Sequence, residues 1–182
     1  MKTCNTLASL AVVGLSACAT QGDPGMAPFS QSGLPATVQV PAGHIVVMHT
    51  MASGDITYQC RVKKDMAGQF EWVFVGPDAG LNDRSGKRVG KYDGPPATWE
   101  SLDGSKVGGA QVAVAPAGAD RIPLQLVKAN AAMGMGTMQG VSYIQRVNTQ
   151  GGVAPASPCD AATLDQKQRV KYTADYIFWR GA

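Results

Sequence analysis

Aromatic and acidic side chains lie close together in one short stretch of this sequence. Tyr92 stands before a Gly94-Pro95-Pro96 turn, and Trp99, Glu100 and Asp103 follow it. Proline restricts the backbone, so this turn could hold the neighbouring side chains rigidly. Tyrosine and tryptophan combine an apolar ring with a polar tip, and two facing carboxyl groups are the acid and base of glycoside hydrolysis. The pattern therefore indicates a sugar-binding groove or a carbohydrate hydrolase.

A structural role for the same residues is the competing interpretation. Trp99 and Glu100 are neighbours, and neighbouring side chains in a strand point to opposite faces of the sheet. Trp99 would then belong to the core, with Glu100 and Asp103 as solvated turn residues. Tyr58 and Trp72, earlier in the chain, complete the candidate ligand-binding set. Adjacency in sequence does not show that two carboxyl groups face one bond, so we assign no catalytic residue.

Histidine and methionine side chains gather in a second stretch. It contains His44, Met48, His49 and Met51, whose imidazole and thioether groups suit copper. On a strand, however, His44 and Met48 point one way while the other two point the opposite way. The glycine-rich run at residues 134–140 is one residue too long for the dinucleotide-binding fingerprint. We therefore expect no metal and no cofactor.

Residues 1–18 resemble the signal peptide of a bacterial lipoprotein. Lys2 precedes an apolar core at residues 7–14 that is too short to span a bilayer, and Leu15-Ser16-Ala17-Cys18 resembles a lipobox. The resemblance implies that residues 1–17 are removed and that Cys18 carries lipid. Ala19 follows it, where an aspartate would mark retention in the inner membrane. We expect an exported protein, lipid-anchored in the outer membrane and facing the periplasm; a plain secretory signal is the alternative.

Composition favours one exported domain. The chain has 182 residues and a formal net charge of +3, which gives no electrostatic reason to expect a nucleic-acid partner. No other stretch approaches the roughly 20 apolar residues of a membrane helix. Residues 18–37 are polar and rich in glycine and proline, and we expect a lipidated flexible tether there. Residues 38–182 then form a single β-rich domain.

Two cysteines remain for pairing after export. Cys4 leaves with the signal peptide and Cys18 carries lipid, so Cys60 and Cys159 are left in an oxidising compartment. A disulfide bond between them is the prediction. Free thiols or metal ligands are the alternative, although the sequence has no CxxC motif and no Cys-His cluster.

Short alternating runs separated by Gly, Pro, Asp and Asn predict strands joined by turns. The predicted strands lie at residues 38–40, 45–50, 56–63, 70–75, 98–102, 107–115, 124–129, 141–148 and 170–179. In the last of them, Tyr172, Ala174, Tyr176 and Phe178 share one face. Helix is indicated only at residues 161–168, with Asp160 as the N-cap. The predicted fold is all-β, an antiparallel sandwich or barrel-like domain with little helix and one disulfide.

A series of short motifs runs in order along the chain: Ile56-Thr57-Tyr58-Gln59-Cys60, Gly94-Pro95 with Trp99-Glu100, Asp103-Gly104-Ser105, Ile122-Pro123, residues 143–152, Cys159 and Tyr172-Thr173-Ala174-Asp175-Tyr176. Together they resemble the secreted bacterial and fungal family catalogued as domain of unknown function 3455, from about Val38 to Trp179. Lys91 stands where the family is expected to carry histidine, which argues against a general-base histidine there. The resemblance implies a fold and boundaries but no activity.

The leading functional hypothesis is a cell-envelope lipoprotein whose β domain is a non-catalytic binding or scaffolding module. Its partners would be the membrane, through the lipid anchor, and an envelope glycan or protein. The alternative is a periplasmic protein that binds or hydrolyses carbohydrate through the aromatic and carboxylate set. A charge-assisted bond between Arg146 and Asp175 is a further structural expectation.

Overall fold

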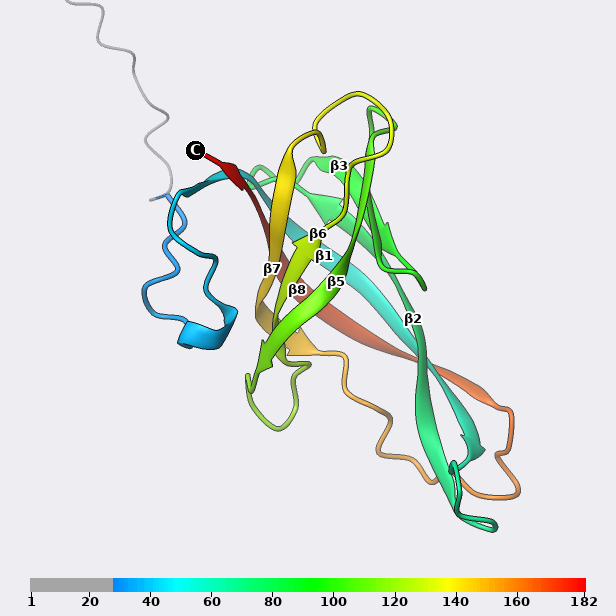
Figure 1. Ribbon diagram of the computed structural model, residues 1–182. Helices are drawn as coiled ribbons and strands as arrows, with labels where there is room; N and C mark the ends of the chain where they lie inside the picture. The colour runs from blue at the N-terminus through cyan, green and yellow to red at the C-terminus, as the bar shows by residue number, and fades with distance from the viewer. Residues whose placement is uncertain (1–27) are drawn as a thin grey trace, which may run out of the picture.

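Antiparallel strands form one sheet that closes into a barrel, and strands adjacent in the barrel follow one another in the chain. A computed structural model describes residues 28–182 (Figure 1). The strands are β1 (His44–Val62), β2 (Phe70–Asn82), β3 (Arg88–Asp93), β4 (Thr98–Ser101), β5 (Lys106–Ala115), β6 (Leu124–Ala129), β7 (Val141–Gly151) and β8 (Lys167–Gly181). The described residues contain one helical turn, η1 (Ala36–Val38), and no helix long and apolar enough to cross a membrane. The predicted all-β fold is confirmed, in its barrel form.

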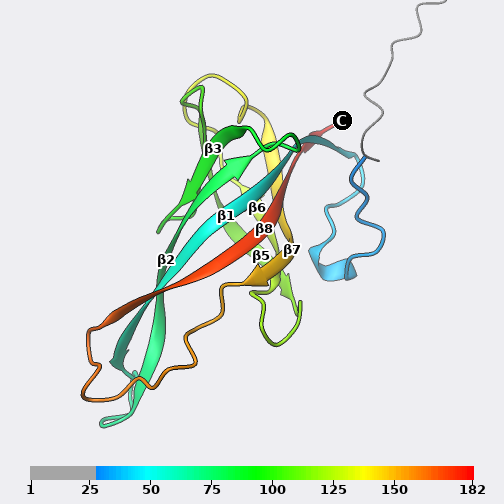
Figure 2. The same cartoon turned by 180° about the vertical axis from the view of Figure 1, so that it is seen from behind.

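Pairing between the first and last strands closes the barrel. β1 pairs with β2 on one side and with β8 on the other, from His44 opposite Gly181 to Gln59 opposite Lys167. β7 follows β8 only as far as Tyr172. The ends of β1, β2 and β8 therefore continue beyond the other strands as a long extension, which both views show (Figure 1 and Figure 2).

The last strand shows how the alternating pattern becomes a barrel wall. Tyr172, Tyr176 and Phe178 face the interior and are at most 3% exposed. Ile177 and Trp179 face outward and are also buried. The predicted inner face is confirmed. The outer face is apolar near the C-terminus because another segment of the chain covers it.

Aromatic side chains fill the middle of the barrel. The rings of Tyr92 and Trp99 stack with centroids 4.6 Å apart, and the Tyr176 ring lies 4.9 and 5.5 Å from them. Smaller apolar side chains complete the core: Ala52, Ile56, Leu81, Val107, Val127 and Ile144. Met138 closes one end from the loop between β6 and β7. The centre of the barrel is therefore packed with side chains rather than hollow.

The segment before β1 packs on the outer face of the later strands. Val38 and Val40 are buried against Leu126, Ile177 and Trp179. Figure 1 shows this segment, in blue, beside β7. The strand predicted at residues 38–40 is wrong, because the helical turn and the extended residues after it pair with no other strand.

A buried amide network fixes the same segment. Gln145 Nε2 donates to Val38 O at 2.6 Å and to Gln31 Oε1 at 3.1 Å, and Gln145 Oε1 accepts from Trp179 Nε1 at 2.8 Å. Gln31 also bonds both backbone groups of Val40. Because these contacts begin before residue 37, the tether predicted for residues 18–37 does not extend that far. Residues 18–27 lie outside the described part of the chain.

Two differences from the predicted strands have local causes. The runs at residues 45–50 and 56–63 form one strand, because Gly54 continues β1 where Ala79 and the Asp78 carbonyl leave no room for a Cβ. In sequence analysis a glycine usually predicts the end of a strand, but here Gly54 permits close packing of two strands. β3 lies where no strand was predicted, since its residues are mostly polar or glycine.

The helix predicted at residues 161–168 does not form. Asp160 Oδ1 accepts bonds from the backbone N–H groups of Ala162 and Thr163 at 2.9 and 3.1 Å, as an N-cap would. The turn ends at Asp165, whose φ of 64° is left-handed, and β8 begins at Lys167. Lys167 and Gln168, which would have continued the helix, pair with β1 instead.

Candidate functional site

The side chains predicted to bind a ligand do not share one surface. Tyr58, Tyr92 and Trp99 point into the barrel and are 9%, 6% and 1% exposed. Trp72 lies on the extension, where its Nε1 donates to Ser157 O at 2.9 Å. Glu100 lies on the outer face of the barrel and Asp103 lies in a loop at one end. The six residues therefore do not form the groove considered from the sequence.

Glu100 lies on the outer face of β4, on the opposite side from Trp99. Its carboxylate is 3.1 Å from Lys106 Nζ and 3.2 Å from Lys91 Nζ. Hydrogen bonds from Lys106 and Lys91 hold the pKa of Glu100 below its usual value. A carboxylate that stays ionised between two lysines is a surface ion-pair partner and is poorly suited to act as a general acid.

Asp103 ties two loops together at one end of the barrel. Its Oδ1 accepts from Ser105 N and Oγ at 2.9 and 2.6 Å, and its Oδ2 accepts from Thr137 N and Oγ1, both at 2.7 Å. These donors, the Ser105 hydroxyl first, hold the pKa of Asp103 well below its usual range. The same bonds position the loop that carries Met138 into the core, so Asp103 has a structural role.

Asp103→Asn is expected to lower the melting temperature by about 2–4 °C at pH 7, because the amide cannot accept all four bonds. The pKa is depressed in the folded state, so the stabilisation is present above the unfolded value near 4 and is lost only as pH falls through the lower folded value. Thermal unfolding across a pH series should show that the difference in melting temperature between the wild type and Asp103→Asn disappears in strong acid. Asp93→Asn is the control, since Asp93 makes only a surface ion pair with Lys91. A melting-temperature difference that is the same at every pH would contradict the stabilising role given to the Asp103 carboxylate charge.

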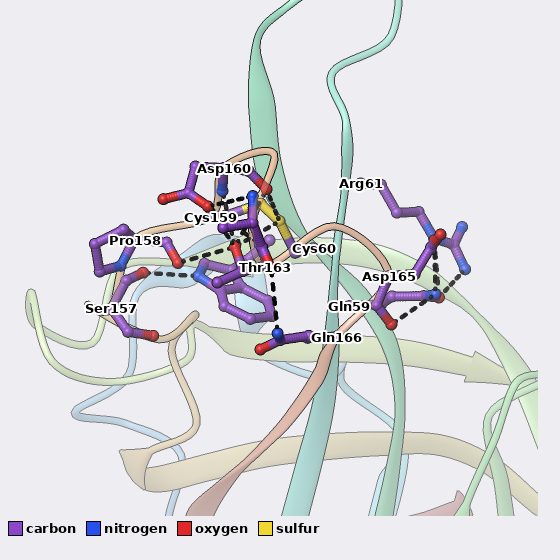
Figure 3. The surroundings of a disulfide bond; sticks show 12 residues. Gln59, Cys60, Arg61, Ser157, Pro158, Cys159, Asp160, Thr163, Asp165 and Gln166 are labelled. Carbon is purple, nitrogen blue, oxygen red and sulfur yellow. Dashed lines mark hydrogen bonds between the residues drawn. A yellow bond between two sulfur atoms is a disulfide. The ribbon is translucent and has the colours of Figure 1, made fainter.

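Cys60 and Cys159 form the predicted disulfide. Figure 3 shows the bond at the end of β1, next to Asp160 and Thr163. The backbone of Cys60 also donates to Gln166 O and accepts from Asp165 N, both at 2.9 Å. The disulfide therefore joins the loop between β7 and β8 to the extension.

A cavity of about 300 Å³ opens where the barrel meets the extension, and we call it the mouth cavity. Tyr92 lies at its inner wall, and apolar and polar side chains alternate around it: Phe74, Pro77, Pro95, Gln111, Gln125 and Arg146. Small-molecule sites have volumes of roughly 300–1,000 Å³ and mostly apolar walls with a few polar groups. The mouth cavity has this composition and lies at the lower end of that size range.

A recess of about 20 Å³ continues from the mouth cavity into the barrel. It shares Tyr92 and Arg146 with the mouth cavity and reaches Tyr172 and Tyr176. The buried hydroxyl of Tyr176 interacts with the hydroxyls of Tyr172 and Tyr92, and neither Tyr172 nor Tyr176 bonds a backbone group or another kind of side chain among residues 28–182. Burial raises the pKa of both phenols, so they stay protonated and able to donate. The recess has room for about one water-sized group.

Arg146 brings a positive charge to the mouth cavity. Its Nε and Nη2 donate to Pro123 O at 3.1 and 3.0 Å. The bond expected between Arg146 and Asp175 is wrong, because the register places Arg146 opposite Tyr176 and Val147 opposite Asp175. Asp175 therefore lies on the outer face of the sheet, where other side chains bind it.

A family model described as a protein of unknown function, DUF3455, matches residues 41–180. The chain belongs to the DUF3455 family. The family predicted from the motifs is confirmed, and the match runs from just before β1 into the end of β8. No curated protein and no solved structure matches this DUF3455 chain.

Close backbone packing shapes the mouth of the DUF3455 barrel. Gly76 on β2 lies against the Gly94 carbonyl with no room for a Cβ. Glycine is required at this approach, which lets the turn between β3 and β4 fold against β2. Pro95 in that turn thereby reaches the wall of the mouth cavity.

Arg146, Tyr172 and Tyr176 are not among the residues predicted to bind a ligand. Alternation along β8 places both tyrosines on the inner face of the DUF3455 barrel. It does not separate a ring that only packs from one whose hydroxyl faces a cavity. The sequence offers one signal for them: interior positions of β8 that could hold purely apolar rings, as Phe178 does, carry tyrosine at residues 172 and 176.

The two histidines lie apart and have other partners. His44 packs edge-on against Tyr143, with ring centroids 5.0 Å apart. His49 Nε2 lies 3.1 Å from Asp175 Oδ2, and its Nδ1 lies 3.0 Å from Arg84 Nη2. Within residues 28–182 no group of three or more His, Cys, Asp or Glu side chains could hold a metal ion.

Proposed function

We propose that the DUF3455 barrel is a non-catalytic binding domain that holds a small molecule at its mouth. The observation that carries this proposal is the group of buried hydroxyls at the end of the recess, where Tyr172 and Tyr176 have only tyrosine hydroxyls as partners. A core that served packing alone would be at least as stable with phenylalanine at both positions, because buried hydroxyls with incomplete hydrogen bonding are destabilising. A ligand that completes these bonds gives the hydroxyls a function.

The chemistry of the mouth supports binding rather than catalysis. The described side chains that line the mouth cavity and the recess include no carboxylate, histidine, serine or cysteine. Nucleophilic and acid–base catalysis usually depends on such groups. The carbohydrate hydrolase considered from the sequence gains no support, because Glu100 and Asp103 lie apart and are bound to other side chains.

We propose further that the domain acts in the cell envelope, held by lipid on Cys18 in the outer membrane and facing the periplasm. Cys18 and residues 1–17 lie outside the described part of the chain. Two observations support the location: the lipobox-like residues 15–18 and the Cys60–Cys159 disulfide. Structural disulfides persist in exported proteins and are rare in the cytosol. The membrane would be one partner, and an envelope glycan or protein could supply the ligand.

Mass spectrometry of the purified native protein tests the anchor. The expected chain begins at Cys18 and carries acyl chains, and Cys18→Ser is expected to accumulate the uncleaved precursor. Cys4→Ser is the matched control and should be processed like the wild type, because Cys4 lies in the part that is removed. An unmodified amino terminus at any position would overturn the proposed anchor.

A fragment screen by nuclear magnetic resonance tests the binding function. The purified processed protein, in lipid nanodiscs, is exposed to mixtures of neutral, anionic and sugar fragments. We expect at least one class to shift the ring signals of Tyr172 and Tyr176 and the side-chain signal of Arg146. If no fragment shifts these signals, the mouth is not a small-molecule site.

A further inference from the structure

We infer that the ligand is a small organic anion whose oxyanion group enters the recess and whose apolar body occupies the mouth cavity. This inference rests on the binding function proposed above and names the chemical class of the ligand. Arg146, Tyr172 and Tyr176 would bind the oxyanion, and Phe74, Pro77 and Pro95 would surround the body.

The first step concerns donors and acceptors in the recess. Tyr176 is 0% exposed and Tyr172 is 3% exposed, and in the described structure their hydroxyls interact only with each other and with the Tyr92 hydroxyl. Each phenol carries a proton to donate. The three phenols can make two bonds among themselves, which leaves one proton to donate. Arg146 is a donor only, and among the described residues its Nε and Nη2 donate to Pro123 O, which leaves Nη1 for another partner. The remaining donors of the recess therefore favour a group that accepts.

The second step concerns charge. Arg146 is the one side chain with a full charge among the described residues that line the two compartments. Two acids act electrostatically on the tyrosines of the recess, and both have partners elsewhere: Asp78 lies 3.5 Å from Arg169, and Asp93 lies 2.9 Å from Lys91. A cation in a partly buried site without an opposing carboxylate favours an anion, because burial weakens solvent screening.

The third step concerns size and shape. The recess of about 20 Å³ accommodates one water-sized group, such as an oxygen of a carboxylate. The mouth cavity of about 300 Å³ accommodates a ring or a short apolar chain beside Phe74, Pro77 and Pro95. Gln111 and Gln125 bond each other across the cavity wall at 2.7 Å, which leaves fewer polar groups for the body of the ligand. A carboxylate on an apolar body fits this division better than a small inorganic ion or a sugar.

Isothermal titration of the processed protein in nanodiscs tests the class directly. Benzoate is the anionic probe and benzamide is its neutral match of nearly the same shape. We expect benzoate to bind at least tenfold more tightly than benzamide, and inorganic phosphate not to compete. Equal affinity for the two rings would overturn the inference, as would competition by phosphate at the benzoate concentration.

Arg146→Gln is expected to weaken benzoate binding at least tenfold, because the charge is lost while an amide donor remains near Pro123 O. Arg61→Gln is the matched control, since Arg61 is exposed and bonds Gln59 on the extension. Unchanged benzoate affinity in Arg146→Gln would contradict the role assigned to the guanidinium.

Tyr176→Phe and Tyr172→Phe separate ligand binding from folding. Each is expected to lose benzoate affinity while the melting temperature stays equal or rises, because the hydroxyl has no partner outside the tyrosine group in the unbound protein. Tyr58→Phe is the control: its hydroxyl donates to Gly152 O at 2.8 Å, so the melting temperature should fall while benzoate still binds. A lower melting temperature in both mouth variants, with no benzoate binding, would show that the recess holds structural water instead.

The fragment screen distinguishes failure of the anion inference from failure of the proposed binding function. If neutral or sugar fragments shift the mouth signals and anions do not, the inference fails and the proposed binding function stands. If no fragment shifts those signals, both fail.

Discussion

Replacing Cys60 and Cys159 together by serine is expected to lower the free energy of unfolding by about 4–5 kcal/mol. The two residues are 99 positions apart, and in the chain-entropy model a bridge closing a loop of that length stabilises by about this amount. The backbone bonds of Cys60 with Asp165 and Gln166 remain available in the variant, so the fold should be retained at low temperature. Urea unfolding followed by circular dichroism measures the difference.

The two single variants provide the control for the disulfide. Cys60→Ser and Cys159→Ser should each lose nearly the whole amount, because either change removes the same bond. Treating the wild type with a reducing agent should produce a similar loss. If Cys159→Ser were as stable as the wild type, the bond would contribute little and the extension would be held by its backbone alone.

Trp99→Ala is expected to cost about 3–5 kcal/mol of unfolding free energy, which is the range for truncating a large buried aromatic residue. Trp99 is 1% exposed, stacks on the ring of Tyr92 and meets the ring of Tyr176 edge-on. Its removal leaves a cavity in the packed centre of the barrel. Chemical denaturation is the measurement.

Trp72→Ala is the matched control for Trp99→Ala. Trp72 is half-buried on the extension and bonds the backbone of Ser157. Its truncation should cost about half as much, because less apolar area returns to water. If Trp99→Ala left stability unchanged and abolished ligand binding, Trp99 would be a stacking residue for ligand, as the sequence first suggested, and not core.

Patterns within one strand could be predicted from the sequence. The alternation along β8 predicted its inner face, and the same rule separated Trp99 from Glu100. The disulfide followed from counting the cysteines that would remain if the chain were exported and processed. Each of these inferences depends on residues close together in sequence or on chemistry independent of the fold.

The mouth could not be predicted because it depends on register. Arg146 reaches the recess only because β7 pairs it with Tyr176, and a shift of one residue would place it on the outer face. Register shifts between Val141 and Tyr143 and between Val147 and Gln150 lie on either side of this pairing, and neither has a clear sequence signature. The alternating pattern within one strand does not predict which side chains on different strands come into contact.

The boundary of the domain was misplaced for a different reason. Residues 29–37 have the composition of a linker, yet Gln31 bonds Gln145 and both backbone groups of Val40. A single polar side chain with several buried partners can hold a segment that composition alone would leave free.

The closing pair of strands has a consequence for how the protein is made. β1 begins at His44, and its neighbour β8 spans Lys167–Gly181, so the two pair only after more than 100 further residues have been made. A nascent polypeptide emerges with its amino terminus first, whether from a ribosome or from a translocation pore. One flank of β1 therefore stays uncovered until residues 167–181 arrive, and Cys60 has no disulfide partner until Cys159 arrives. Such non-local pairing is slow, and an uncovered strand invites aggregation, so we expect the newborn chain to need a holding chaperone that releases it only after β8 has been made.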